Sequence, residues 1–251
     1  MQPETSLTNL GAWVILVLNQ MTKRKPKQRE LPFKHWGGKR TGAGRKPNGR
    51  RAGESHRTRA PLASRFPVHV NVKLKEGLPS LRRATERDAL IEAFRAGAER
   101  FGFRLVHYAI LRNHLHFLVE ARDRRALSRG MQGLLIRVAR RLNRVWDRAG
   151  KVFADRYHDV ILRTPQQVRN ALVYVLQNAK KHGRTLSRTL GRTLDSFASG
   201  LWFDGWREHP RTPRSAPIRP TTDAKTWLLR AGWRRRGLLS LQDAPAGAPG
   251  H

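Results

Sequence analysis

Apolar and polar positions along the chain first settle into a regular pattern near residue 66. In residues 66–74, apolar side chains recur at every second position: Val68, Val70, Val72 and Leu74. This alternation predicts a β-strand, because successive side chains of a strand point to opposite faces. The period then lengthens to that of an amphipathic helix, with apolar side chains at Leu90, Ile91, Phe94, Ala98 and Phe101. We expect Gly102 to end this helix.

The pattern continues with two strands, a long helix and a fourth strand. Residues 104–111 and 114–120 are apolar runs separated by a short turn at Arg112-Asn113. Residues 126–150 carry a helical apolar stripe that Gly150 is expected to end, and residues 151–163 predict a further strand. The order β-α-β-β-α-β is that of a ferredoxin-like split βαβ fold. We therefore predict an α+β domain with an antiparallel sheet and helices packed on it.

One more helix is predicted after the fourth strand, and both of its ends are marked. Thr164 is a favourable N-cap, Pro165 suits the first helical position, and Gln167 completes a capping box. Gly183 is expected to end the helix. A buried stripe is predicted at Val168, Ala171, Leu172, Val175 and Ala179. Beside it, spacings of four and three residues place one polar set on a shared face: Asn170, Tyr174, Asn178 and Lys181.

Charge changes the picture outside this domain. The chain has 51 Lys and Arg against 18 Asp and Glu, a formal net charge of +33, which favours a nucleic-acid partner over a membrane surface. Residues 22–60 hold 14 Lys and Arg against two Glu, with six glycines and three prolines, so we expect a disordered basic arm. Its glycine-rich part, residues 37–49, resembles an AT-hook or serves as a counterion-releasing tail. Its candidate DNA contacts are Lys39, Arg40, Arg45 and Lys46.

The chain divides into four predicted parts. A leader at 1–21, expected to be disordered, precedes the arm at 22–60, the folded domain at 64–185 and a basic, partly helical extension at 186–251. The apolar patch at 12–18 is too short to span a bilayer, and residues 226–241 have the composition of a short basic amphipathic helix. The absence of cysteine excludes disulfides, thiolate zinc sites and cysteine nucleophiles. We predict a cytoplasmic, nucleoid-associated protein without a membrane partner.

Two histidines lie in the strand predicted at 114–120. His114 and His116 are two residues apart, so both point to one face of the sheet while Leu115 points to the other. Such a pair is either half of a metal site or a local coincidence. An amide oxygen from Asn178 is a candidate third ligand, and His158 is a candidate spare ligand. This incomplete set would leave positions open for phosphate oxygens and water, as a catalytic metal requires.

The segment "RNHLHFLVE" (112–120) resembles the HUH motif of the single-tyrosine HUH transposases. Residues 150–183 are similar to the distal half of their REP-associated, IS200-like tyrosine transposase branch, and the resemblance spans about residues 66–183. It implies that His114 and His116 bind a divalent cation, Mg or Mn, with help from Asn178. It also implies that Tyr174 cleaves single-stranded DNA beside a hairpin. The chain departs from the branch at Arg112, where proline is usual, and at Ala179, which follows Asn178 where the branch has proline.

These observations predict a DNA strand transferase that cleaves and rejoins through a covalent phosphotyrosine, as in transposition. Its partner would be single-stranded or hairpin DNA, with Arg112 and Lys181 as further candidate contacts, and a homodimer is left open. Two other classes compete. One is a nuclease whose histidine–metal site activates water, for which Glu120 is the main acidic candidate. The other is a binding-only relative.

The remaining aromatic residues have less specific interpretations. Tyr108 is expected to pack in the sheet, and Tyr157 to be a sheet residue or a DNA contact rather than the nucleophile. The tryptophans of the C-terminal extension either stack on bases or anchor this extension to the domain: Trp202, Trp206, Trp227 and Trp233. We favour the anchoring role.

Overall fold

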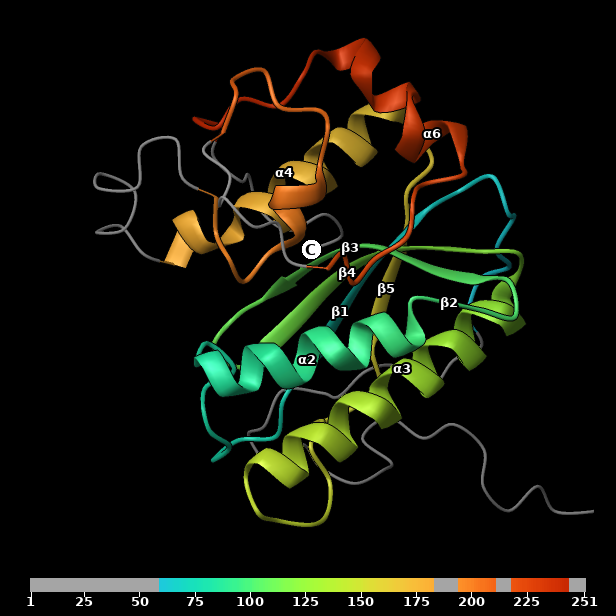
Figure 1. The fold of residues 1–251 in the computed structure, drawn as a ribbon. Helices are drawn as coiled ribbons and strands as arrows, with labels where there is room; N and C mark the ends of the chain where they lie inside the picture. The colour runs from blue at the N-terminus through green and yellow to red at the C-terminus, as the bar shows by residue number, and fades with distance from the viewer. Residues whose placement is uncertain (1–58, 183–193, 211–217, 244–251) are drawn as a thin grey trace, which may run out of the picture. The chain divides into compact units, whose positions relative to one another are not determined.

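The structure is a computed structural model that describes residues 59–182, 194–210 and 218–243 (Figure 1). All of the described residues belong to one compact unit. The predicted leader and nearly all of the predicted arm lie outside the described residues. So do the candidate DNA contacts Lys39, Arg40, Arg45 and Lys46, and the side chain of Lys181. Within the described residues, no helix is long and apolar enough to cross a membrane.

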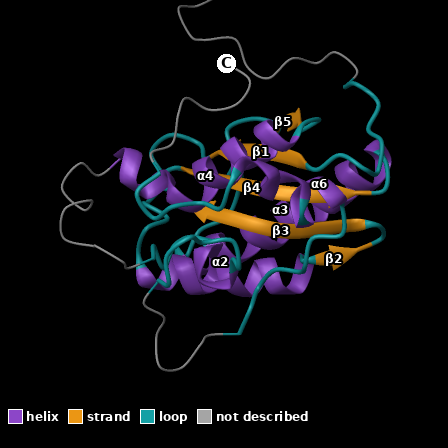
Figure 2. Cartoon of the chain, turned by 90° about the horizontal axis from the view of Figure 1, so that it is seen from above, coloured by secondary structure: helices purple, strands orange, loops and turns teal. Residues whose placement is uncertain are grey.

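A five-stranded antiparallel sheet forms the centre of the described domain. Its strands are β1 (Val68–Lys73), β2 (Glu99–Arg100), β3 (Phe103–Ile110), β4 (His114–Ala121) and β5 (His158–Ile161). They lie side by side in the order β2-β3-β4-β1-β5 (Figure 2). Apart from the two-residue β2, the elements follow the predicted β-α-β-β-α-β order. The predicted α+β fold class is confirmed.

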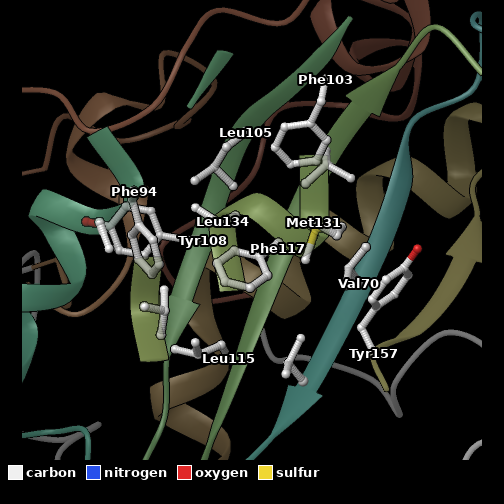
Figure 3. Packing of buried hydrophobic residues seen from close by; sticks show 14 of the residues in the cluster. Val70, Phe94, Phe103, Leu105, Tyr108, Leu115, Phe117, Met131, Leu134 and Tyr157 are labelled. Atoms are coloured by element: carbon white, nitrogen blue, oxygen red, sulfur yellow. The ribbon is translucent and has the colours of Figure 1, made fainter. Parts of the chain in front are cut away.

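Two helices, α2 (Ala84–Gly97) and α3 (Arg124–Val145), cover one face of the sheet (Figure 1). The alternating valines of β1 point into this core, where Val70 lies with Phe117 of β4 and Met131 of α3 (Figure 3). Tyr108 belongs to the same cluster, so its predicted packing role is confirmed, and Tyr157, just before β5, is buried in this cluster too. This core explains why apolar residues occupy every second position of β1.

The opposite face is covered by α4 (Pro165–His182) and by the C-terminal segments (Figure 1). These segments contain η1 (Ser199–Trp202), α6 (Trp227–Arg230) and η2 (Gly232–Arg236). They pack on α4, with Trp206 and Trp233 buried in a second apolar cluster. Because α4 lies between the sheet and these segments, all residues from 171 to 178 are buried.

The start of α4 follows the prediction. The backbone N–H of Gln167 donates to Thr164 Oγ1 at 3.2 Å, and Gln167 Oε1 accepts from the backbone N–H groups of Arg163 at 2.7 Å and Thr164 at 3.3 Å. These bonds form the expected capping box and satisfy backbone donors that the helix itself leaves unpaired. The orientation of α4 on the sheet is therefore anchored at its first turn.

The predicted end of the first helix is wrong. Helix α2 ends at Gly97, and the chain turns at Phe101 and Gly102, which have φ angles of 51° and 80°, to pair β2 with β3. The pairing begins where the Leu105 N–H donates to the Ala98 carbonyl at 2.7 Å. Phe101, expected on the apolar helix face, is 84% exposed at this turn.

Three other boundaries also differ from the prediction. Helix α3 ends at Val145 rather than at Gly150, and β5 begins at His158 rather than at residue 151. The intervening residues pair with the end of β1 only through backbone bonds at Lys73 and Lys75. In the C-terminal extension, residues 226–241 form the short α6 and η2 instead of one helix, because the backbone leaves helical geometry at Ala231.

Candidate active site

The register of the sheet gathers histidines on the face that α4 covers. On β4, His116 lies opposite Asn71 of β1, and His114 lies opposite Lys73. On the other side of β1, Asn71 also faces His158 of β5. These side chains share one face because paired residues of neighbouring strands point the same way. His114 and His116 therefore lie on one face, as the alternation predicted.

Tyr174 of α4 packs against the face of the sheet that carries the histidines. The ring centroids of His114 and His116 are 4.9 Å apart, with the two rings perpendicular. The Tyr174 ring lies 5.0 Å from that of His116, at an interplanar angle of 83°. Tyr174 is 7% exposed and Asn178, one turn later, is 1% exposed, whereas Asn170 is exposed. The predicted polar face thus has an exposed end at Asn170 and a buried part, in which Tyr174 packs on His116.

His69 is the site neighbour that sequence reasoning missed. Its Nε2 lies 3.2 Å from Nδ1 of His116, and its ring lies 5.7 Å from that of Tyr174. In β1, polar residues alternate with the valines: His69, Asn71 and Lys73. This alternation could have identified His69 as a residue of the polar face. The alternation alone does not show which residues His69 contacts. The pairing register of β1 with β4 is needed to place His69 beside His116.

Burial sets the protonation of the site. It lowers the pKa of His69 to about 4, with a smaller contribution from the charge of His158. Burial also raises the pKa of the Tyr174 phenol, and the polar side chain of Asn178 opposes that rise. At neutral pH, His69 is therefore a neutral hydrogen-bonding group and Tyr174 carries its proton. Cleavage by Tyr174 would require a means of removing that proton.

The donors available to a cation at this site are imidazoles and an amide rather than carboxylates. In the described part of the chain, no three or more His, Cys, Asp and Glu side chains form a group that could hold a metal ion. The His114 and His116 imidazoles and the Asn178 amide would have to be completed by oxygens of substrate and water. Such a partial ligand set fits a cation that acts on a bound phosphate, since a closed set cannot reach substrate.

The Glu120 carboxylate is bonded to the C-terminal segment and not to the histidines in the described structure. Its carboxylate accepts hydrogen bonds at 2.8 Å from the backbone N–H groups of Lys225 and Thr226 and from Thr226 Oγ1. Arg104 Nε lies 3.8 Å away. Glu120 therefore joins β4 to the start of α6.

The other candidate residues lie apart from Tyr174. The Tyr157 hydroxyl lies 3.4 Å from Ser128 Oγ of α3, on the opposite side of the sheet from α4. Arg112 is exposed in the turn before His114. Trp206 and Trp233 anchor the C-terminal segments in the second cluster, as predicted, while Trp227 is 47% exposed with the Arg235 guanidinium 4.8 Å from its ring centre.

Comparisons with known proteins address the same region. Residues 67–177 match the sequence model of a family described as "Transposase IS200 like". The chain is similar to a solved REP-associated tyrosine transposase bound to a REP hairpin, with 15% sequence identity and a TM-score of 0.46 over 58% of this chain and 82% of that one. A search of curated proteins found no match. The family match spans β1 to the Tyr174 turn of α4, so this part of the described domain is similar to the IS200-like transposases.

Proposed function

We propose that the chain is a metal-dependent DNA strand transferase of the REP-associated branch, with Tyr174 as its nucleophile. The observation that carries the proposal is the packing of the Tyr174 ring 5.0 Å from His116, on the face that also holds His114. A purely structural helix could cover this face with apolar residues. A phenol against two imidazoles instead supplies a nucleophile beside candidate cation ligands.

The proposed step exchanges one phosphodiester bond for another. The phenolic oxygen of Tyr174 loses its proton and attacks the phosphorus of a single DNA strand. The P–O bond to the neighbouring deoxyribose breaks, and the departing oxygen takes a proton to become a free hydroxyl. The covalent phosphotyrosine retains a phosphodiester bond, so attack by a hydroxyl of another strand end rejoins the DNA and restores the phenol.

His114, His116 and Asn178 would hold the divalent cation, Mg or Mn. When bound, the cation would polarise the scissile phosphate and favour the ionised phenol. The chain's own residues would orient the reaction: the His116 ring lies edge-on to the Tyr174 ring, and the Asn178 side chain favours the ionised phenol. Burial of the site on α4 would restrict competing water.

The proposed substrate is single-stranded DNA beside a hairpin. The family acts on DNA by its name, and the net charge of +33 supports a polyanionic partner. Arg112 is exposed two residues before His114, and we assign it a phosphate contact near the site. We assign the arm residues Lys39, Arg40, Arg45 and Lys46, together with Lys181, to phosphate contacts as well.

We further propose that Tyr174 acts with the histidines of its own chain. Its ring packs on His116 within one chain, which supports action in cis. Mixing Tyr174→Phe with His116→Ala protein should then restore no cleavage. Recovery of cleavage in the mixture would show that the helix is exchanged between two subunits.

Two alternatives receive less support. A nuclease that activates water would use a carboxylate at the site, and Glu120 is instead bonded to Lys225 and Thr226. A binding-only protein would not need the phenol beside two imidazoles. No observation favours either alternative over strand transfer.

The test is a cleavage assay with single-stranded hairpin DNA and Mn or Mg, analysed on a denaturing gel. Wild type should form a protein–DNA adduct that survives denaturation, and Tyr174→Phe should form none. Tyr157→Phe is the matched control, because it removes a tyrosine hydroxyl from the other face of the sheet. Cleavage by wild type without any adduct would instead support the water-activating nuclease.

A further inference from the structure

His69 lies beside both principal groups of the proposed site. It is on β1, between the strands that carry His116 and His158, and it is 4% exposed. Its ring contacts that of His116 on one side and lies edge-on to Tyr174, at 73°, on the other. No reaction step described above uses His69, although a buried polar side chain at this position must be satisfied.

The contact between His69 and His116 has the geometry of a hydrogen bond between rings. His69 Nε2 and His116 Nδ1 are 3.2 Å apart, and the ring planes differ by only 24°. The two nitrogens meet the distance and angle of a hydrogen bond, so an N–H of one ring can donate to the lone pair of the other. In a pair of neutral imidazoles, one nitrogen donates and the other accepts.

The direction of this bond determines which nitrogen of His116 can bind a cation. A metal-binding imidazole uses a nitrogen without a proton, and its other nitrogen usually donates to a neighbouring acceptor that fixes the ring. If His116 donates from Nδ1, it presents Nε2 as the ligand. If His69 donates instead, Nδ1 of His116 is the deprotonated nitrogen, and it is directed at His69 rather than at a cation.

We propose that His69 is a positioning residue that accepts a hydrogen bond from His116 Nδ1–H and thereby presents His116 Nε2 to the cation. This inference rests on the proposed function, because it assumes a cation at the histidine pair. His69 would carry its own proton on Nδ1. Its contact with Tyr174 would hold the phenol ring against the same oriented imidazole.

The first test measures the tautomer of His116 without metal or DNA. Long-range ¹H–¹⁵N spectra of the full chain labelled at histidine should show the proton of His116 on Nδ1 in the wild type. His69→Phe keeps a ring but removes the acceptor, so the proton should redistribute toward Nε2. His69→Gln offers an amide oxygen to the same donor and should restore the Nδ1–H form.

The second test measures Mn²⁺ affinity by titration in the absence of DNA. His69→Phe should weaken binding by about 10–100-fold, the usual effect of removing a group that orients a metal ligand, and His69→Gln should recover most of that loss. The matched control is His107→Phe. His107 is 5% exposed on the same face but bonds Ser199 rather than His116, so its loss should leave Mn²⁺ affinity unchanged.

Several results would overturn the role of His69. A wild-type His116 with its proton on Nε2 would reverse the bond. Three histidine nitrogens coupled to bound Mn²⁺, in place of two, would make His69 a ligand. Equal losses of affinity in His69→Phe and His107→Phe would reduce the effect to general destabilisation. The tautomer measurement involves no cleavage, so it stands even if Tyr174 proves not to be the nucleophile.

Discussion

The two faces of the sheet differ in what the same strands present. Toward α2 and α3, β1 and β4 present valine, leucine, phenylalanine and alanine, all almost fully buried. Toward α4, the alternate positions of the same strands carry His69, Asn71, His114 and His116. The two-residue period of a strand thus encodes a stabilising core on one face and a chemical site on the other. The difference indicates that stability and activity should respond separately to adjacent substitutions.

The largest expected effect comes from neighbouring residues that face opposite ways. Phe117→Ala should reduce the free energy of unfolding by about 3–5 kcal/mol, because it opens a cavity in the core beside Val70 and Met131. His116→Ala should leave most of the stability but lower cleavage by about 100-fold or more, since a cation ligand contributes several kcal/mol to catalysis. Urea unfolding and cleavage rates, measured on both variants, test the separation. Equal loss of stability in both would contradict it.

Acid should destabilise the domain through a buried histidine on the α4 face. Burial, with a smaller contribution from Arg219, lowers the pKa of His107 to about 3 in the folded state. The unfolded chain therefore takes up this proton first as the pH falls below about 6.5, and stability falls by about 1.4 kcal/mol per pH unit until the folded pKa is reached. His107→Gln cannot titrate, so its stability should depend less on pH between 6.5 and 4.5. Identical pH profiles for wild type and variant would show that His107 does not contribute.

Glu120 tests whether an acidic residue on the α4 face is chemical or structural. Glu120→Gln should lower the free energy of unfolding by about 2 kcal/mol, because the charged acceptor of three hydrogen bonds to Lys225 and Thr226 is replaced by a neutral amide. Cleavage should persist below the unfolding temperature. A variant with wild-type stability and no cleavage would place Glu120 in the chemistry after all.

The smallest expected effect concerns the cap that anchors α4. Thr164→Ala removes the side-chain acceptor at the helix start and should cost about 1 kcal/mol in stability. Because the cap fixes only the first turn, the yield of adduct should change little. Thermal unfolding and an adduct assay should be measured on the same variant. If the cap also positions Tyr174, the substitution would lower both the stability and the yield of adduct.

Much of the fold follows from local pattern. Alternation predicts β1, an apolar run predicts β4, the three-and-four spacing predicts the two packed helices, and the capping box fixes the start of α4. The end of α2 was missed because the pairing of β2 with β3 competes with the helix at Ala98, and such a pairing is not visible in helical periodicity. The start of β5 was missed because residues 151–157 include a bend and pair only through an isolated bridge between Phe153 and Leu74.

The site was predictable only in part, for a similar reason. His114 and His116 are two residues apart, so their shared face follows from the strand itself. Tyr174 and Asn178 follow from helical spacing together with the family resemblance. His69 is 47 residues from its partner His116, and only the antiparallel register of β1 and β4 brings the two rings together. Contacts of this kind arise from topology rather than from any local motif.

The central claim, that Tyr174 is the attacking group, can be tested by locating the DNA on the protein. The three tyrosines fall in separate tryptic peptides, 105–112, 157–163 and 170–180. After reaction with single-stranded DNA and Mn or Mg, nuclease trimming and digestion, mass spectrometry should find a nucleotide on peptide 170–180 alone, at Tyr174. A nucleotide on the peptide that carries Tyr157 or Tyr108 would contradict the account.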